Sequence, residues 1–203
     1  MAKHSGLTYK DVRPSLYGLP GNALITGLLS TKLTKDCLLR ETWWKDNAEL
    51  TRKLGNRQHH TDEFVNNNKM SVYILFFSFY ESVIRELVRG LLPGACNDAY
   101  DPFANVYGAL LKRVDLQRHS PLLDFARTMR NLIHNNGFFL NKQKRDESHT
   151  FNGTVYFFEH DKPVRFALAT VLYEIYEQAL NLSDDLNTHP DIIALAPRDV
   201  KQP

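Results

Sequence analysis

The stretch Leu122-Leu-Asp-Phe-Ala-Arg-Thr-Met-Arg-Asn-Leu-Ile-His-Asn-Asn-Gly137 decides the fold of this chain, because it has the pattern of one amphipathic helix with a marked end. Its apolar residues recur at the spacing of a helix that faces a core: Leu122, Phe125, Ala126, Met129, Leu132 and Ile133. At about 100° per residue, the opposite face gathers four polar residues within an arc of about 100°: Arg127, Arg130, Asn131 and His134. The Asn-Asn-Gly sequence predicts that the helix stops directly after His134.

The polar face of this helix is suited to phosphoesters. It carries no acid after Asp124, whereas a face that serves only solubility mixes acids with bases. Guanidinium groups hold phosphate oxygens in pairs, and an imidazole transfers protons near neutral pH. A structural alternative is that the basic residues complement the negative end of the helix dipole, which favours Arg and His in the last turn.

The bulk composition is that of an ordinary globular protein. The chain has 203 residues, of which 43% are hydrophobic and 24% charged, and this is enough for one core. A formal net charge of +2 is too small to indicate nucleic-acid binding over the whole surface, so any basic site is local. The two cysteines, Cys37 and Cys96, are isolated, which fits a reducing compartment.

No targeting, membrane or cofactor signal is expected from the pattern. The N-terminus lacks an apolar signal region, and the longest apolar run is too short to span a bilayer, so we expect a cytoplasmic protein without a membrane partner. His59 and His60 do not form a metal-ligand motif, and no glycine-rich phosphate loop is present. We therefore expect no metal and no cofactor.

The whole sequence predicts a mainly α bundle of four to six helices. We expect helices at 23–39, 61–92, 103–114, 121–134 and 163–182, and a small β-hairpin or extended excursion near 150–159, where Asn152-Gly153 is a turn signal. Residues 1–20 are expected to be irregular. Residues 1–60 are expected to form an N-terminal arm and helical extension that packs on a helical domain at 61–203, within one globular unit.

The 61–92 segment is apolar on most sides, so we expect it to lie at the centre of the bundle or partly in a subunit interface. Thr61 or Asp62 is the expected N-cap, and Pro93-Gly94 is the expected stop. Ser120 is likewise the expected N-cap of the 121–134 helix. Glu81 lies within the apolar stripe and needs a partner, since burying an unpaired carboxylate is costly. We expect it to pair with Arg127 or Arg130.

Two runs, Arg130-Asn-Leu-Ile-His-Asn-Asn-Gly137 and Phe76-Phe-Ser-Phe-Tyr-Glu81, resemble the HEPN superfamily (higher eukaryotes and prokaryotes nucleotide-binding domains), especially its uncharacterised prokaryotic members. The resemblance covers about residues 61–182. Many members of that family resemble or are metal-independent ribonucleases of toxin–antitoxin, CRISPR-associated and antiviral systems. Their motif is an arginine, four to six residues and a histidine, often with a polar residue after the arginine. They usually act as dimers whose motif helices meet in one cleft.

In this sequence the motif is divided between two arginines. Six residues separate Arg127 from His134, which fits the spacing, whereas Arg130 is followed by the polar Asn131 but only three residues separate it from His134. The resemblance implies catalysis by Arg127 and His134, with Arg130 and Asn131 close behind. Supporting or substrate-binding roles fall to Asn135, Asn136 and Glu81.

The resemblance implies an endoribonuclease that leaves 2′,3′-cyclic phosphate and 5′-hydroxyl ends in a defence, stress or toxin–antitoxin context. Its expected partners are RNA, a second copy that meets it through the motif helix and the 61–92 helix, and an antitoxin or regulatory protein. The alternative is a catalytically inactive HEPN-like module that binds RNA, a nucleotide or a protein partner. The chemistry itself needs a base, an acid and positive charge on the phosphorane, which His134 and the arginines of two copies would supply.

Overall fold

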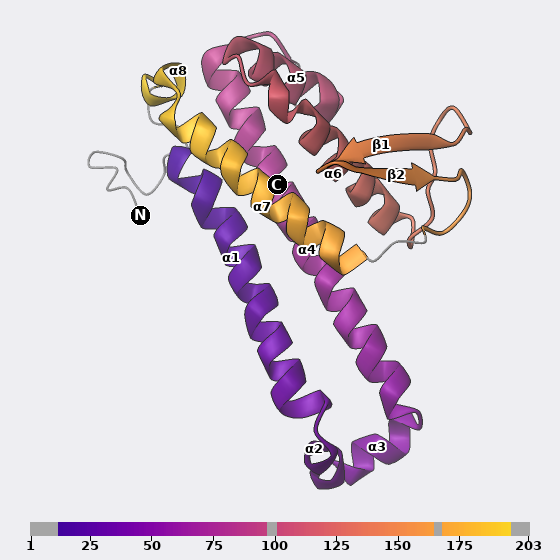
Figure 1. Ribbon diagram of the computed structural model, residues 1–203. Helices are drawn as coiled ribbons and strands as arrows, with labels where there is room; N and C mark the ends of the chain where they lie inside the picture. The colour runs from indigo at the N-terminus through magenta and orange to yellow at the C-terminus, as the bar shows by residue number, and fades with distance from the viewer. Residues whose placement is uncertain (1–11, 97–100, 165–167, 196–203) are drawn as a thin grey trace.

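A computed structural model describes residues 12–96, 101–164 and 168–195, and these residues are mainly helical (Figure 1). The prediction of a mainly α fold is confirmed, although short helices raise the number above the expected four to six. The α-helices are α1 (Val12–Leu33), α2 (Glu41–Asp46), α3 (Ala48–Leu54), α4 (Arg57–Leu91), α5 (Phe103–Arg113), α6 (Ser120–His134), α7 (Leu168–Thr188) and α8 (Pro190–Ile193). A π-helical turn η1 (Thr34–Leu38), a 3₁₀ turn η2 (Gln117–His119) and the strands β1 (Glu147–Phe151) and β2 (Thr154–Phe158) complete the described elements.

A long arm and a compact head make up the molecule (Figure 1). In the arm, the C-terminal part of α1 runs beside the first half of α4, and α2 and α3 connect the two helices at the far end; the N-terminal part of α1 lies beside α7 in the head. A Cβ atom added at Gly27 would lie 3.2 Å from Cγ1 of Val72, so the two helices approach each other closely at this point. The head contains the second half of α4 with α5, α6, α7 and the hairpin. None of the helices within the described ranges is both long and apolar enough to cross a membrane.

The expectation of an irregular segment at residues 1–20 is wrong for residues 12–20, which belong to α1; residues 1–11 lie outside the described ranges. Pro14 lies in the first turn of α1, where a backbone N–H has no partner within the helix, so the missing N–H of proline costs no hydrogen bond there. Pro20 has no amide hydrogen to donate to the carbonyl of Leu16, four residues earlier. The hydroxyl of Ser183 on α7 lies 3.3 Å from that carbonyl oxygen and 2.9 Å from the carbonyl oxygen of Ala179, so α7 places a polar group beside the freed carbonyl.

The start of α4 lies four residues before the expected position. Asn56 is the N-cap, and its side-chain oxygen accepts a hydrogen bond from the backbone N–H of His59 at 3.1 Å. Thr61, one of the expected caps, is buried inside the helix and donates its hydroxyl to the carbonyl of Arg57 at 2.9 Å. The predicted stop is confirmed, because α4 ends at Leu91 directly before Pro93-Gly94.

The predicted hairpin is present and packs against α6. Asn152 and Gly153 take φ angles of 49° and 75°, the two left-handed positions that a tight hairpin turn between twisted strands requires. The ring of Phe125 on α6 stacks on Phe151 at 4.6 Å between centroids and lies 4.8 Å from the ring of Tyr156. The hairpin therefore covers one flank of the helix that carries the predicted site.

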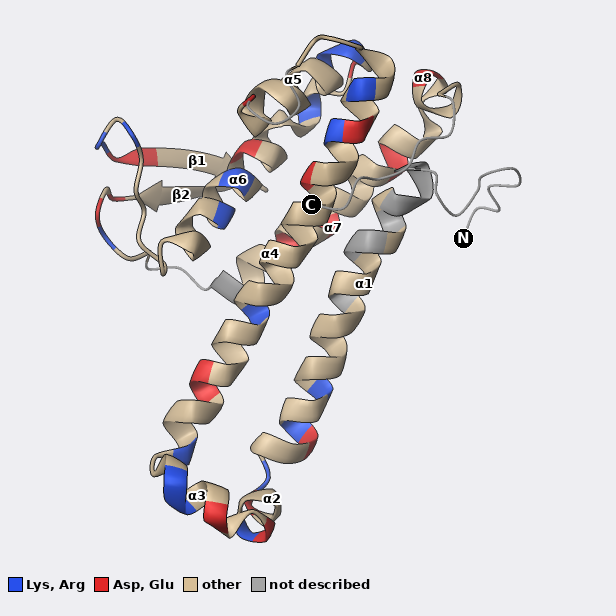
Figure 2. Cartoon of the chain, turned by 180° about the vertical axis from the view of Figure 1, so that it is seen from behind, with Lys and Arg blue, Asp and Glu red and all other residues tan. Residues whose placement is uncertain are grey.

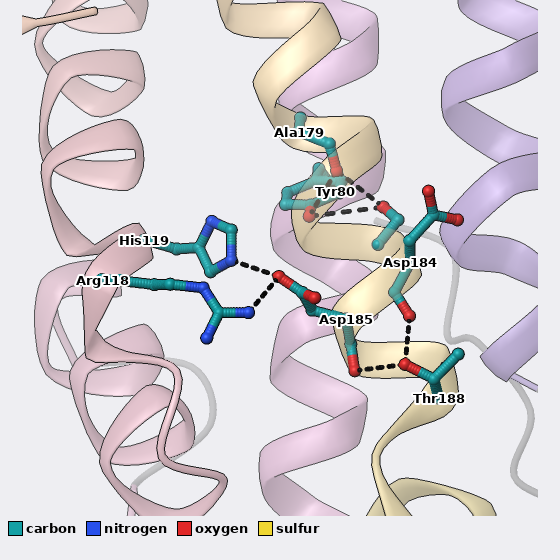
Figure 3. A network of polar contacts seen from close by, with 8 residues as sticks. Tyr80, Arg118, His119, Ala179, Asp184, Asp185 and Thr188 are labelled. Carbon is teal, nitrogen blue, oxygen red and sulfur yellow. Dashed lines mark hydrogen bonds and ion pairs between the residues drawn. The ribbon is translucent and has the colours of Figure 1, made fainter.

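Polar contacts fix α7 to the start of α6 and to α4 (Figure 3). The carboxylate of Asp185 accepts hydrogen bonds from Arg118 at 2.7 Å and from His119 at 2.6 Å, both in the turn η2 that leads into α6. Tyr80 of α4 donates its hydroxyl to the carbonyl of Ala179 at 3.2 Å. The expected cap of α6 is wrong by one residue: His119 takes the N-cap position, and Ser120 is already the first residue of the helix.

Candidate functional site

Helix α6 places the predicted residues on the face opposite its apolar stripe. All six residues of the expected stripe are buried. Arg127, Arg130 and Asn131 are half-buried, and His134 is exposed as the last residue of the helix. The basic bands of α6 lie on the part of the helix between the hairpin and α4 (Figure 2).

Arg127 lies beside an acid and a buried tyrosine. Its guanidinium is 3.9 Å from Oδ1 of Asp124, with 39% and 45% of the two side chains exposed, so this ion pair is weak. Asp124 accepts a hydrogen bond from the hydroxyl of Tyr107 on α5. Burial and the bond to Asp124 raise the pKa of Tyr107 well above its usual range, and Arg127 acts in the opposite direction. The Nε atom of Arg127 is buried without a hydrogen-bond partner.

Arg130 packs on aromatic rings of α4. Its guanidinium carbon lies 5.6 Å from the centroid of Phe77, a cation–π distance, and its Nε is buried without a hydrogen-bond partner. Nearby, Tyr73 donates its hydroxyl to the carbonyl of Ala126 at 2.8 Å. Burial raises the pKa of Tyr73 far above its usual range, and the positive charge of Arg130 opposes this. Within the described ranges, no carboxylate lies within 4 Å of the Arg130 guanidinium.

The end of α6 exposes the imidazole of His134. The backbone N–H of Asn136 donates to the carbonyl of Ile133 at 3.1 Å, and that of Gly137 donates to Leu132 at 2.9 Å. Asn136 and Gly137 take φ angles of 54° and 87°, as a left-handed helix stop requires. The predicted stop is therefore confirmed, and the backbones of these residues serve it. The side chain of Asn135 is half-buried and that of Asn136 is exposed.

The expected partner of Glu81 is wrong. Glu81 accepts hydrogen bonds from Arg85, one turn further along α4, at 3.0 Å from Nε and 2.7 Å from a terminal nitrogen. The i,i+4 spacing places these two side chains next to each other on the same face of α4, so Glu81 has its partner within its own helix. Glu81 therefore leaves Arg127 and Arg130 to other partners.

Sequence reasoning missed the residues of other elements that support α6. Tyr107 and Tyr73 come from α5 and α4, and no local pattern links them to α6. A second imidazole, that of His149 on β1, also reaches this helix: its Nε2 is 3.4 Å from the hydroxyl of Thr128 and 3.6 Å from a carboxylate oxygen of Glu147. Only the packing of the hairpin on α6 brings it there.

The helix geometry separates the two candidate arginines. At about 1.5 Å per residue, Arg130 lies about 6 Å from His134 along the axis, and Arg127 about 10 Å. Arg130 is therefore about one helical turn from His134, close enough for both to contact one phosphate group, whereas Arg127 lies about one turn further away. Among the residues that the structure describes, no three His, Cys, Asp or Glu side chains gather as a metal site would need.

The chain matches no family model, no curated protein and no solved structure.

Proposed function

We propose that this chain is a HEPN-like, metal-independent endoribonuclease that acts as a homodimer in a defence, stress or toxin–antitoxin setting. The observation that carries the proposal is the pair of arginines on α6. Arg130 has an aromatic ring and no close carboxylate within the described ranges, and Arg127 has one distant acid. An exposed imidazole, His134, stands at the end of the same face.

The reaction follows from the chemistry of RNA. A base removes the proton of the 2′-hydroxyl, and the oxygen attacks the phosphorus. The bond to the 5′-oxygen then breaks, and an acid protonates that oxygen, which yields a 2′,3′-cyclic phosphate and a 5′-hydroxyl. One His134 can carry out one of the two proton transfers, and the His134 of a second copy supplies the other. Arg130 binds the charged phosphorane, with Arg127 on the adjoining phosphate and Asn131 orienting the imidazole.

The experiment is cleavage of an end-labelled RNA of mixed sequence by the purified protein in excess EDTA. We expect His134→Ala to lose at least about a hundredfold in rate, since general acid–base catalysis contributes roughly 10²–10⁴. Arg130→Ala and Arg127→Ala should each lower the rate, and the larger loss identifies the motif arginine. The matched controls are His59→Ala and Arg52→Ala, two exposed residues at the far end of the arm, which should cleave as the wild type does.

The same variants distinguish the alternative function. If the wild type binds RNA without cutting it, and His134→Ala only weakens that binding, then the chain is a binding module and the proposal is wrong. Cutting that survives in His134→Ala would also contradict it, because no other residue of the α6 face can carry the proton.

A further inference from the structure

A groove lies where α1, α4 and α7 meet, and none of the proposed catalytic residues of α6 lines it. Its volume is about 410 Å³, which lies within the roughly 300–1,000 Å³ typical of small-molecule sites. The buried rings of Tyr73 and Phe76 and the side chains of Val72 and Leu172 line it. Tyr176 lines it as well, with its ring 5.0 Å from that of Phe76. Most of the lining is therefore hydrocarbon or aromatic.

The charged groups of the groove have one sign. Lys35 in η1 and Lys69 on α4 belong to the lining, and none of the lining residues is an acid. Both lysines are exposed, and within the described ranges neither has a carboxylate within 4 Å. The acid nearest in sequence, Asp36, is already paired with Lys32 and Arg40. The two ammonium groups are therefore free to meet an anion.

The lysines and the aromatic residues lie toward opposite ends of the groove. On the antiparallel helices α1 and α4, Lys35 and Lys69 are nearer the α2–α3 end of the arm, whereas Phe76 and Tyr176 are nearer the head. A ligand that matches both ends has an apolar chain and an anionic head group. Burial of the chain would supply most of the affinity, and the charge pairing would set the orientation and specificity.

From this arrangement we propose that the groove binds an anionic amphiphile: a single acyl or alkyl chain on the aromatic floor, with its carboxylate or phosphate head between Lys35 and Lys69. The site is separate from the α6 face and does not depend on the ribonuclease proposal. Carboxylate and phosphate heads share the chemistry that the lysines recognise, and the experiment separates them.

The experiment is isothermal titration of the full chain with three ligands of equal chain length: dodecanoate and dodecyl phosphate below their micelle concentrations, and dodecanol below its solubility limit. We expect one site per chain and at least about fivefold tighter binding of an anionic ligand than of the alcohol, as two partly exposed charge pairs would give. The tighter of the two anions names the head group.

Two variants test the placement of the ligand. The double reversal Lys35→Glu/Lys69→Glu should remove the preference for the anions and leave dodecanol binding intact. The matched control Lys45→Glu/Lys112→Glu makes the same change in net charge at exposed positions outside the groove and should keep the preference. Thr31→Trp, which fills the groove from its exposed rim, should abolish binding of all three ligands.

Three results would overturn the proposal. The first is equal binding of anion and alcohol, and the second is a preference that survives the reversal of both lysines. The third combines two measurements: the wild type binds none of the ligands and is dimeric in solution, and the variant Leu28→Glu is monomeric. Leu28 is an exposed residue of the groove lining. That result would mean that a second copy covers the groove.

Discussion

Tyr73 is the residue that connects the groove to α6. Its side chain lines the groove, and its hydroxyl donates to the carbonyl of Ala126 on the motif helix. The side chain is buried, so this hydrogen bond forms away from water. This hydrogen bond is therefore one of the contacts that hold α6 against α4, in the region where Arg130 lies over Phe77.

Replacement of Tyr73 by Phe tests this connection. The change removes one buried hydrogen bond and keeps the ring, so we expect the free energy of unfolding to fall by about 1 kcal/mol in urea denaturation. The control is Tyr173→Phe, at an exposed tyrosine of α7, which should change stability by less than about 0.5 kcal/mol. Equal losses in the two variants would mean that the hydroxyl of Tyr73 does not stabilise the packing of α6 on α4.

Elements were predictable from the sequence where short-range chemistry determines them. The end of α6 at Asn135-Asn136-Gly137 and the hairpin turn at Asn152-Gly153 depend on backbone conformations that these residues favour locally. The helix through Pro20 was not predictable, because proline commonly ends a helix and the part of α7 that packs beside Leu16 comes more than 160 residues later in the chain. Tyr107 and His149 were missed as neighbours of α6 for the same reason.

Alanine substitutions at a glycine of the hairpin turn and at a glycine inside a helix test the backbone conformation of the turn. Gly153 has φ of 75° and open space where a Cβ atom would lie, so Gly153→Ala should destabilise the fold by about 1 kcal/mol through backbone strain alone. Gly108 lies inside α5, also with open space around it, and Gly108→Ala should stabilise by roughly 0.5–1 kcal/mol. Thermal unfolding of both variants shows whether each substitution lowers or raises the stability of the fold. A loss of stability in both would contradict the assigned backbone at one of these positions.

The contact between η2 and α7 predicts a dependence of stability on pH. Burial raises the pKa of Asp185, but hydrogen bonds and charges from His119 and Arg118 outweigh it, so the folded pKa is lower than normal. A depressed carboxyl pKa stabilises the fold fully above the unfolded value of about 3.9, and this contribution is lost as pH falls through the folded pKa. The stability difference between wild type and Asp185→Asn should therefore be larger at pH 6 than at pH 3 in urea titrations. The matched control is Asp46→Asn, which makes the same chemical change at an exposed carboxylate.

The whole molecule has little net charge, and this bears on the RNA binding that we propose. A formal net charge of +2 supplies little long-range attraction for RNA, so the proposed ribonuclease should depend on phosphate contacts at α6. Each copy offers two arginines on that face, and a dimer in which two such faces meet offers four. The number of phosphate contacts is thus a measure of how many copies form one site.

The salt dependence of RNA binding counts these contacts. For single-stranded RNA, the logarithm of the affinity falls against the logarithm of the salt concentration with a slope of about −0.7 per neutralised phosphate. A composite site with four arginines should give about −2.8, whereas one copy acting alone should give about −1.4. The measurement uses His134→Ala, which should bind the RNA without cutting it, over a series of potassium chloride concentrations. Arg130→Ala in that background removes two contacts from a dimer, and the slope should then return to about −1.4. A slope of about −1.4 before that second change would mean that the two α6 faces do not share a cleft. The second histidine of the proposed reaction would then have to come from another element. His149, whose imidazole lies beside Thr128, would be the first residue to replace in that case.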